Sequence, residues 1–234
     1  MGAFNSKYLR VGRDYEMREQ MSKYKFKKLI IESFRNGLRL HFDSILLFDN
    51  GAFPSAFQLS VLALEELSKS NWIEHYYNIS IGGNGFPDQK FEQDWLKLLY
   101  IHTRKHKAFF GDGISGNYTS KFIKFIKSGG LERKKQKATY VGLDKKGKQI
   151  DVNSRISTPN QIKENDAKQI ISLLNDGLKN LCMEKKFHEP DLSITIKNEL
   201  ITDELLSKLK QWKYRSGIRR YQLLETKLKN SSSQ

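Results

Sequence analysis

The chain has 234 residues and carries 41 Lys and Arg against 26 Asp and Glu, a formal net charge of +15. This length suffices for one sizeable hydrophobic core, and an apolar content of 38% with 12% aromatic residues excludes a disordered chain. The longest apolar run, residues 44–48, is far shorter than the roughly 20 residues of a membrane span, which excludes a membrane-spanning segment.

The single cysteine, Cys182, excludes a disulfide framework and a CxxC zinc site. The first 20 residues contain no apolar stretch and no small-residue cleavage site of the kind found in secretory signals. Together these observations predict a protein of the reducing cytoplasm that has no contact with a membrane.

The first half of the chain shows helical periodicity. Residues 1–20 are polar and predict an N-terminal arm, and the spacing of apolar residues predicts a helix over 23–48. Pro54 suits the first turn of a second helix, predicted over 54–77. Apolar residues surround most of the circumference of this second helix, so we expect it at the centre of the fold.

A third helix is predicted over 89–110, because Phe91, Trp95, Leu98 and His102 fall on one stripe at helical spacing. The segments that follow are shorter. We predict a short helix over 121–127, two short strands around a Lys-Lys-Gly turn over 136–152, a long helix over 161–186 and a basic helix over 203–229.

These elements predict a mainly α fold. The expected architecture is a bundle of four to five helices over residues 21–188, with a small β-hairpin insertion at about 136–152. Residues 189–234 would form a basic C-terminal helical extension.

The positive charge is concentrated in three stretches. Residues 121–148 hold ten Lys and Arg against two acids, ten minus two being +8, and residues 97–110 and 208–220 are basic without any acid. Such clustering is typical of proteins that bind RNA or another polyanion. The alternative is a lysine-rich surface that only keeps the protein soluble.

Charged residues interrupt the apolar second helix. Glu66 lies four residues after Leu62 on an otherwise apolar row, and Glu65 lies four residues before Lys69, a spacing that favours an ion pair. A buried carboxylate is costly unless it is paired. Two interpretations stay open, a polar functional site between helices and an ion pair that sets helix register.

Two histidines, His102 and His106, lie four residues apart on the third helix and therefore share a face. A histidine next to Arg104, Lys105 and Lys107 suits acid–base chemistry on a phosphodiester. The alternatives are a metal pair, for which no third ligand can be named, and histidines that only fill the core or the helix surface. We predict no metal and no cofactor.

Three segments resemble the AbiV family of abortive-infection proteins. They are GAFPSAFQLSVLALEELSKS (51–70) with its Leu-Glu-Glu-Leu-Ser-Lys core, HTRKHK (102–107) and RKKQKATYVGLD (133–144). The segments occur in the family's order, and the resemblance covers about residues 25–188.

The resemblance implies a bundle of the HEPN superfamily, a role in bacterial defence against phage, and a dimer. Many HEPN proteins are metal-independent ribonucleases with an Arg followed, after four to six residues, by a His near the start of a late helix. This sequence departs from that pattern, because its only match runs from Arg35 to His41 in the first long helix.

Three hypotheses follow. The first is a HEPN-type endoribonuclease in which His102 or His106 is the acid or base and Glu65, Glu66 and Lys69 orient the site. The second is a non-catalytic dimeric module that binds RNA, the translation machinery or a phage-encoded protein. The third is a housekeeping protein that binds nucleic acid. The expected phosphate-binding residues are Arg104, Lys107, Arg133, Lys134, Lys135 and Lys137.

The two polar groups of the second and third helices are expected to meet. Because Glu66 and His102 each lie on an apolar row, we predict that they form a pair across the packed helices.

Overall fold

Two long antiparallel helices form the centre of the computed structural model, which describes residues 21–83, 85–110, 118–147, 149–187 and 196–218. They are α1 (Lys23–Asp49) and α2 (Phe53–Gly82), joined by a tight turn in which Gly51 has a φ of +74°. Ser22 caps α1 by accepting a hydrogen bond from the backbone of Lys25. The absence of a side chain at Gly37 allows close approach, since a Cβ there would lie 2.7 Å from Leu67.

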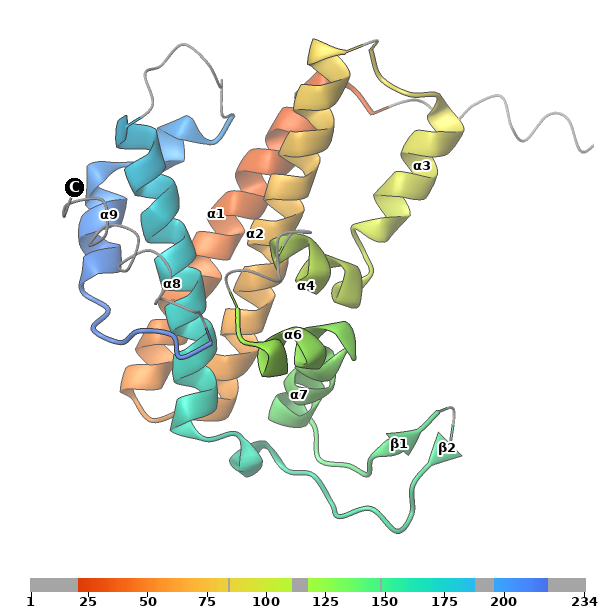
Figure 1. The fold of residues 1–234 in the computed structure, drawn as a ribbon, viewed down its shortest axis with the longest axis vertical. Coiled ribbons are helices and arrows are strands. Elements are labelled where there is room, and N and C mark those ends of the chain that lie inside the picture. The colour runs from red at the N-terminus through yellow and green to blue at the C-terminus, as the bar shows by residue number, and fades with distance from the viewer. Residues whose placement is uncertain (1–20, 84, 111–117, 148, 188–195, 219–234) are drawn as a thin grey trace, which may run out of the picture.

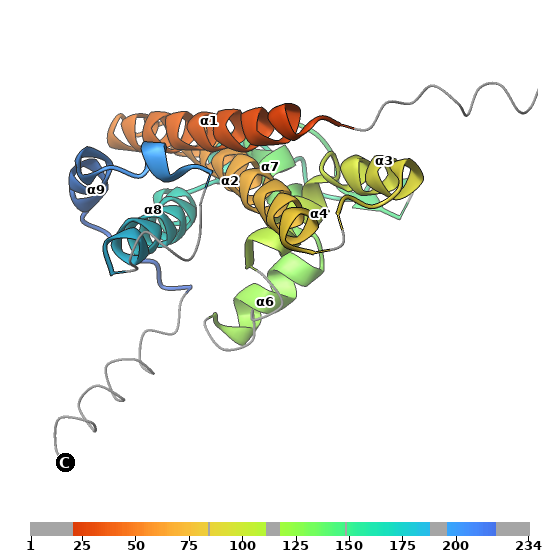
Figure 2. The same cartoon turned by 90° about the horizontal axis from the view of Figure 1, so that it is seen from above.

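The remaining helices lie on two sides of this hairpin (Figures 1 and 2). On one side are α8 (Glu164–Phe187) and α9 (Asp203–Lys210). On the other side are four short helices, α3 (Gln89–Leu98), α4 (His102–Phe110), α6 (Ser120–Lys127) and α7 (Gly130–Thr139). Helix α2 contacts α1, α4, α7 and α8, which confirms the prediction that it is central.

The apolar core has two parts. The larger part joins α1, α2, α8 and α9 and includes Phe34, Leu64, Leu174 and Leu209. The smaller part is rich in aromatic rings and packs the start of α1 and the end of α2 against α3, with Tyr76 stacked 4.1 Å from Trp95. The mainly helical fold is therefore as predicted.

The strands are short and project from the bundle (Figure 1). Strands β1 (Lys145–Lys146) and β2 (Gln149–Ile150) pair antiparallel, with Lys145 opposite Ile150, and Gly147 turns between them with a φ of +62°. The prediction of a hairpin is confirmed, but its start is corrected, because residues 136–139 continue helix α7. Two short 3₁₀ helices, Pro159–Gln161 and Asn198–Leu200, precede α8 and α9.

Two predicted helices are also corrected. The helix predicted over 89–110 breaks after Leu98, and α4 begins at His102. The helix predicted over 203–229 ends at Lys210; residues 211–218 are not helical, and 219–229 lie outside the described residues. The chain leaves the helix there because Trp212 packs against Phe48 and donates a hydrogen bond to Ser172. The predicted arm over 1–20 also lies outside the described residues.

Among the helices of the described residues, none combines the length and the apolar character that crossing a membrane requires.

Candidate functional site

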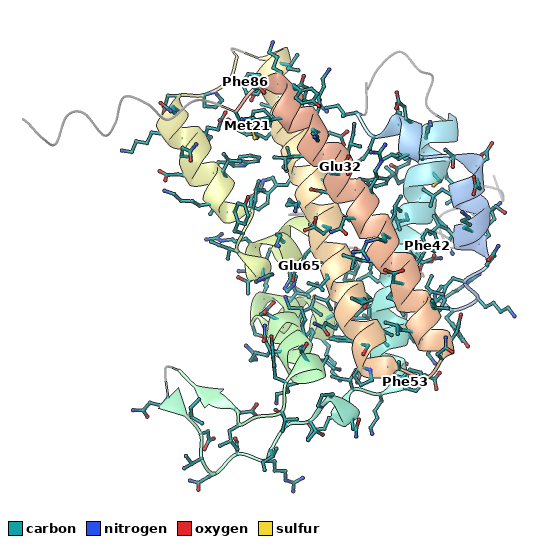
Figure 3. All side chains as sticks on the ribbon, turned by 180° about the vertical axis from the view of Figure 1, so that it is seen from behind. Met21, Glu32, Phe42, Phe53, Glu65 and Phe86 are labelled. Atoms are coloured by element: carbon teal, nitrogen blue, oxygen red, sulfur yellow. The ribbon has the colours of Figure 1, made fainter. Side chains whose placement is uncertain are left out.

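The most polar part of the interior surrounds Glu65, near the middle of α2. Its side chain faces α4 and α7 (Figure 3), and the residue is only 1% exposed. A helix turns by about 100° per residue, so Glu65 and Glu66 point in different directions. The row with Val61, Glu65 and Ser68 is buried, whereas the row with Leu62, Glu66 and Lys69 is only half-buried.

Four nitrogen atoms surround the Glu65 carboxylate. Oε2 lies 2.6 Å from Nδ1 of His102 and 3.2 Å from Nζ of Lys105, and Oε1 lies 2.9 Å from Nε2 of His106 and 2.7 Å from Nζ of Lys135. Burial raises the pKa of Glu65, but the hydrogen bonds from His106, Lys135 and His102 outweigh burial and hold that pKa well below its usual range. The carboxylate is therefore ionised at neutral pH.

The local backbone brings these donors to Glu65. The break after Leu98 starts a new helix at His102, so that Lys105 and His106 face inward. Gly129, with a φ of +72°, makes the sharp turn from α6 into α7. That turn directs Lys135 at Glu65.

A second carboxylate completes the charge balance. Glu132 lies 2.8 Å from Nζ of Lys135, one helical turn away on α7. Burial raises the pKa of Glu132, but the hydrogen bonds from Lys135 and Gln136 and the charge of Lys135 outweigh burial, so the net shift is downward. Two carboxylates, Glu65 and Glu132, thus balance the two ammonium groups of Lys105 and Lys135.

The ionised carboxylate determines which histidine nitrogens carry protons. A carboxylate can only accept hydrogen bonds, so His102 must donate from Nδ1 and His106 from Nε2. The two rings differ in access, because the side chain of His102 is 49% exposed and that of His106 is 2% exposed. In the described residues Nε2 of His102 has no hydrogen-bond partner. It is the nitrogen at this site that can exchange a proton with a ligand.

The cluster also offers ligands for a metal ion. Ligand atoms of Glu65, His102 and Glu132 all lie within 4.8 Å of one another. However, Nζ of Lys135 contacts all three residues, at 2.7 Å from Glu65, 2.8 Å from Glu132 and 3.4 Å from His102. A divalent ion would have to displace this ammonium, which already supplies positive charge to the two carboxylates.

The structure corrects the predicted pairs by one residue. His102 meets Glu65 and not Glu66, and Glu66 pairs with Lys69 at 2.8 Å in place of the predicted Glu65–Lys69 pair. The stripe that motivated the prediction is only partly buried, since Trp95 is 8% exposed whereas Phe91 is 53% exposed. Beside Trp95, the buried residue of α3 is Glu92, which does not belong to that stripe.

The predicted phosphate-binding residues divide into two groups. Arg104 and Lys107 are exposed on α4, the helix that begins at His102. The others make contacts within the fold: Arg133 with the carbonyl of Ser128, Lys134 with Asp166, Lys135 with Glu65, and Lys137 with Asp144.

Two residues of the cluster, Lys105 and Glu132, were absent from the predicted site. Lys105 lies in the HTRKHK segment, and Glu132 is three residues before Lys135, a spacing typical of ion pairs on helices. Those two signals could have identified them.

Arg35 and His41 do not form a site. Arg35 is exposed and pairs with Glu32, whereas His41 is fully buried and contacts Asn175 at 3.2 Å. The side chains of Arg35 and His41 therefore do not share a surface, although the two residues match the Arg–His pattern in sequence.

A mainly helical bundle of this kind is consistent with a HEPN-class protein. The family model described as AbiV, of that class, matches residues 25–179. The match spans more than half of the chain, and the chain therefore belongs to the AbiV family. Membership indicates a role in abortive infection, a defence against phage. No curated protein and no solved structure matches the chain.

Proposed function

We propose that this protein acts in abortive infection as a metal-independent ribonuclease whose reactive group is the imidazole of His102. The observation that supports this proposal is the 2.6 Å contact between Nδ1 of His102 and the buried Glu65 carboxylate. A carboxylate that holds one ring nitrogen protonated and directs the other outward is the arrangement used in general-base catalysis.

The proposed reaction transfers the phosphoryl group from the 5′ oxygen of the next nucleotide to the 2′ oxygen of the preceding one. Nε2 of His102 takes the proton of the 2′-hydroxyl, the 2′ oxygen bonds to phosphorus, and the bond from phosphorus to the 5′ oxygen breaks. Water protonates the departing 5′ oxygen, and the resulting hydroxide takes the proton from His102. The products are a 2′,3′-cyclic phosphate and a 5′-hydroxyl. Arg104 and Lys107, exposed on the same helix, would hold the phosphate.

Two substitutions test the role of His102. His102→Asn keeps an amide donor near the position of Nδ1 but removes Nε2, whereas the control His106→Gln keeps a donor near the position of Nε2. In purified protein incubated with total RNA in EDTA, we expect wild type and His106→Gln to form cyclic phosphate ends. We expect His102→Asn to form none while its melting temperature stays near that of wild type, because its side chain is half-exposed.

The runner-up function is a non-catalytic module that binds RNA, the translation machinery or a phage protein. The four nitrogen contacts of Glu65 support it, since they tie α4 and α7 to α2 and would set the register of these helices. This alternative predicts no cleavage in EDTA, and a loss of phage protection in His102→Asn that accompanies a lower melting temperature.

We also propose that the protein is a cytoplasmic homodimer. Most apolar side chains of α2 are buried within the chain, but the segment from residue 140 to 156 carries apolar side chains that are 38–76% exposed: Tyr140, Val141, Leu143, Ile150, Val152 and Ile156. An exposed apolar surface of this kind favours a contact with a second copy. Light scattering at tens of micromolar that gave the monomer mass of 27.3 kDa would refute the dimer.

A further inference from the structure

A hollow lies on the other side of the α1–α2 hairpin from Glu65. Its volume is about 770 Å³, and its walls come from α1 and from the end of α9 with the segment that follows it. Figure 3 shows Phe42, one of its lining residues, and Glu65 on opposite sides of the hairpin. The volume lies within the range of small-molecule sites.

One wall of the hollow is aromatic and held in place. The indole of Trp212 donates a hydrogen bond to Ser172 at 2.9 Å and lies edge-on to Phe48 at 5.2 Å. Tyr214 packs against this indole at 4.9 Å, and 43% of the residue remains exposed. Trp212 is buried, so Tyr214 is the partly exposed ring, and the ammonium of Lys168 lies 5.3 Å from its centre. A flat ring that is fixed by a core contact and partly exposed is suited to stacking on a planar ligand.

Apart from Phe42 and Ile45, the rest of the lining is polar and contains both signs of charge. Lys208 pairs with Glu204 at 2.7 Å, but Asp49, Gln211 and Lys213 make no side-chain hydrogen bond or ion pair within the described part of the chain. Lysine recognises phosphate, whereas carboxylate and amide groups accept hydrogen bonds from the edges of bases.

We propose that this hollow is a nucleotide-binding site, in which a base stacks on Tyr214 and a phosphate contacts Lys213. A nucleotide matches the three parts of the lining: its planar base suits the tyrosine ring, its phosphate suits the lysine, and the hydrogen-bond donors of its base suit the carboxylate and amide groups. The nucleotide is either free or one unit of single-stranded RNA. The site is separate from the Glu65 cluster, so the proposal does not depend on ribonuclease activity.

The test measures binding to the full chain by calorimetry. The probes are the four 5′-nucleoside monophosphates and a 2′-O-methylated ten-nucleotide RNA, which cannot be cleaved through its 2′ oxygen. We expect Tyr214→Ala to raise the Kd about tenfold or more, the usual effect of losing a stacking ring, and Lys213→Ala to raise it several-fold. Lys213 is exposed and makes no side-chain hydrogen bond or ion pair with the residues that the structure describes, so its removal tests the site even if Tyr214→Ala folds poorly.

The controls are Tyr100→Ala, which removes an 81% exposed ring elsewhere, and Lys210→Ala, which removes a lysine of the same basic stretch that does not line the hollow. Both should bind as wild type does. An RNA that binds far more tightly than the monophosphates identifies the ligand as RNA, and equal Kd values identify it as a free nucleotide.

Three results would overturn the proposal. The first is that no probe binds at millimolar concentration. The second is that the control substitutions weaken binding as much as the substitutions in the hollow. The third is that His102→Asn loses binding. The last would place the nucleotide at the Glu65 cluster. Loss of cleavage in His102→Asn with unchanged monophosphate binding would support both proposals separately.

Discussion

Glu65→Gln and Glu66→Gln form a matched pair of substitutions, because the residues are adjacent and the chemical change is the same. Their surroundings differ. Glu65 is 1% exposed and contacts two histidines and two lysines, whereas Glu66 is half-buried and has Lys69 as its ion-pair partner. The structure therefore predicts very different costs for two conservative changes.

The cost of Glu65→Gln follows from the charges left behind. The amide removes the negative charge between Lys105 and Lys135, and Lys105 then has no other carboxylate partner in the described part of the chain. Breaking a buried pair in this way costs about 3–5 kcal/mol of unfolding free energy. Glu66→Gln removes a partly exposed pair, which is worth about 0.2–1 kcal/mol.

Thermal unfolding followed by circular dichroism at pH 7 measures this difference. For a chain of this size, 1 kcal/mol shifts the melting temperature by roughly 2–4 °C. Glu65→Gln should therefore lower it by roughly 6–20 °C, and Glu66→Gln by less than about 4 °C. An equal loss in the two variants, or a greater loss in Glu66→Gln, would refute the assignment of Glu65 as the buried centre.

Three further predictions concern pH, metal ions and salt. Burial lowers the pKa of His41 from 6.5 to about 4, so the unfolded chain takes up the proton first and unfolding free energy should fall as pH drops from 6.5 to 4. The 2.5-unit difference corresponds to about 3 kcal/mol at 1.36 kcal/mol per unit, and urea titrations of His41→Gln should lack this slope. Lys135→Ala removes the ammonium that lies between Glu65, His102 and Glu132, which leaves these three residues free to bind a metal ion. Zn²⁺ should therefore raise the melting temperature of this variant more than that of wild type. An equal rise in the two proteins would contradict the role of Lys135 as the local cation. Replacing both Arg104 and Lys107 with Ala should reduce the slope of log K for single-stranded RNA against log salt concentration by about 1.4, at about 0.7 per lost phosphate contact. An unchanged slope would show that neither residue contacts phosphate.

The sequence by itself determined the helical class and the residues that matter most. Periodicity located α1, α6 and α8 to within a few residues, and the apolar circumference of α2 indicated its central place. Glu65, His102 and His106 were recognised because a carboxylate in an apolar helix and a histidine pair in a basic segment are costly without partners. These properties are local, and neighbouring residues are enough to reveal them.

The tertiary structure alone decided which of these groups meet. Because α2 is apolar on most sides, its own pattern does not distinguish the side of Glu65 from that of Glu66; the helices packed against it do. The break after Leu98 rotated His106 inward and left His102 at the surface. Lys135 has the same charge as the other lysines of its basic stretch, and it became part of the site because the turn at Gly129 placed its ammonium between two carboxylates. Contacts between distant segments depend on how helices pack, which charge and periodicity along the chain do not specify.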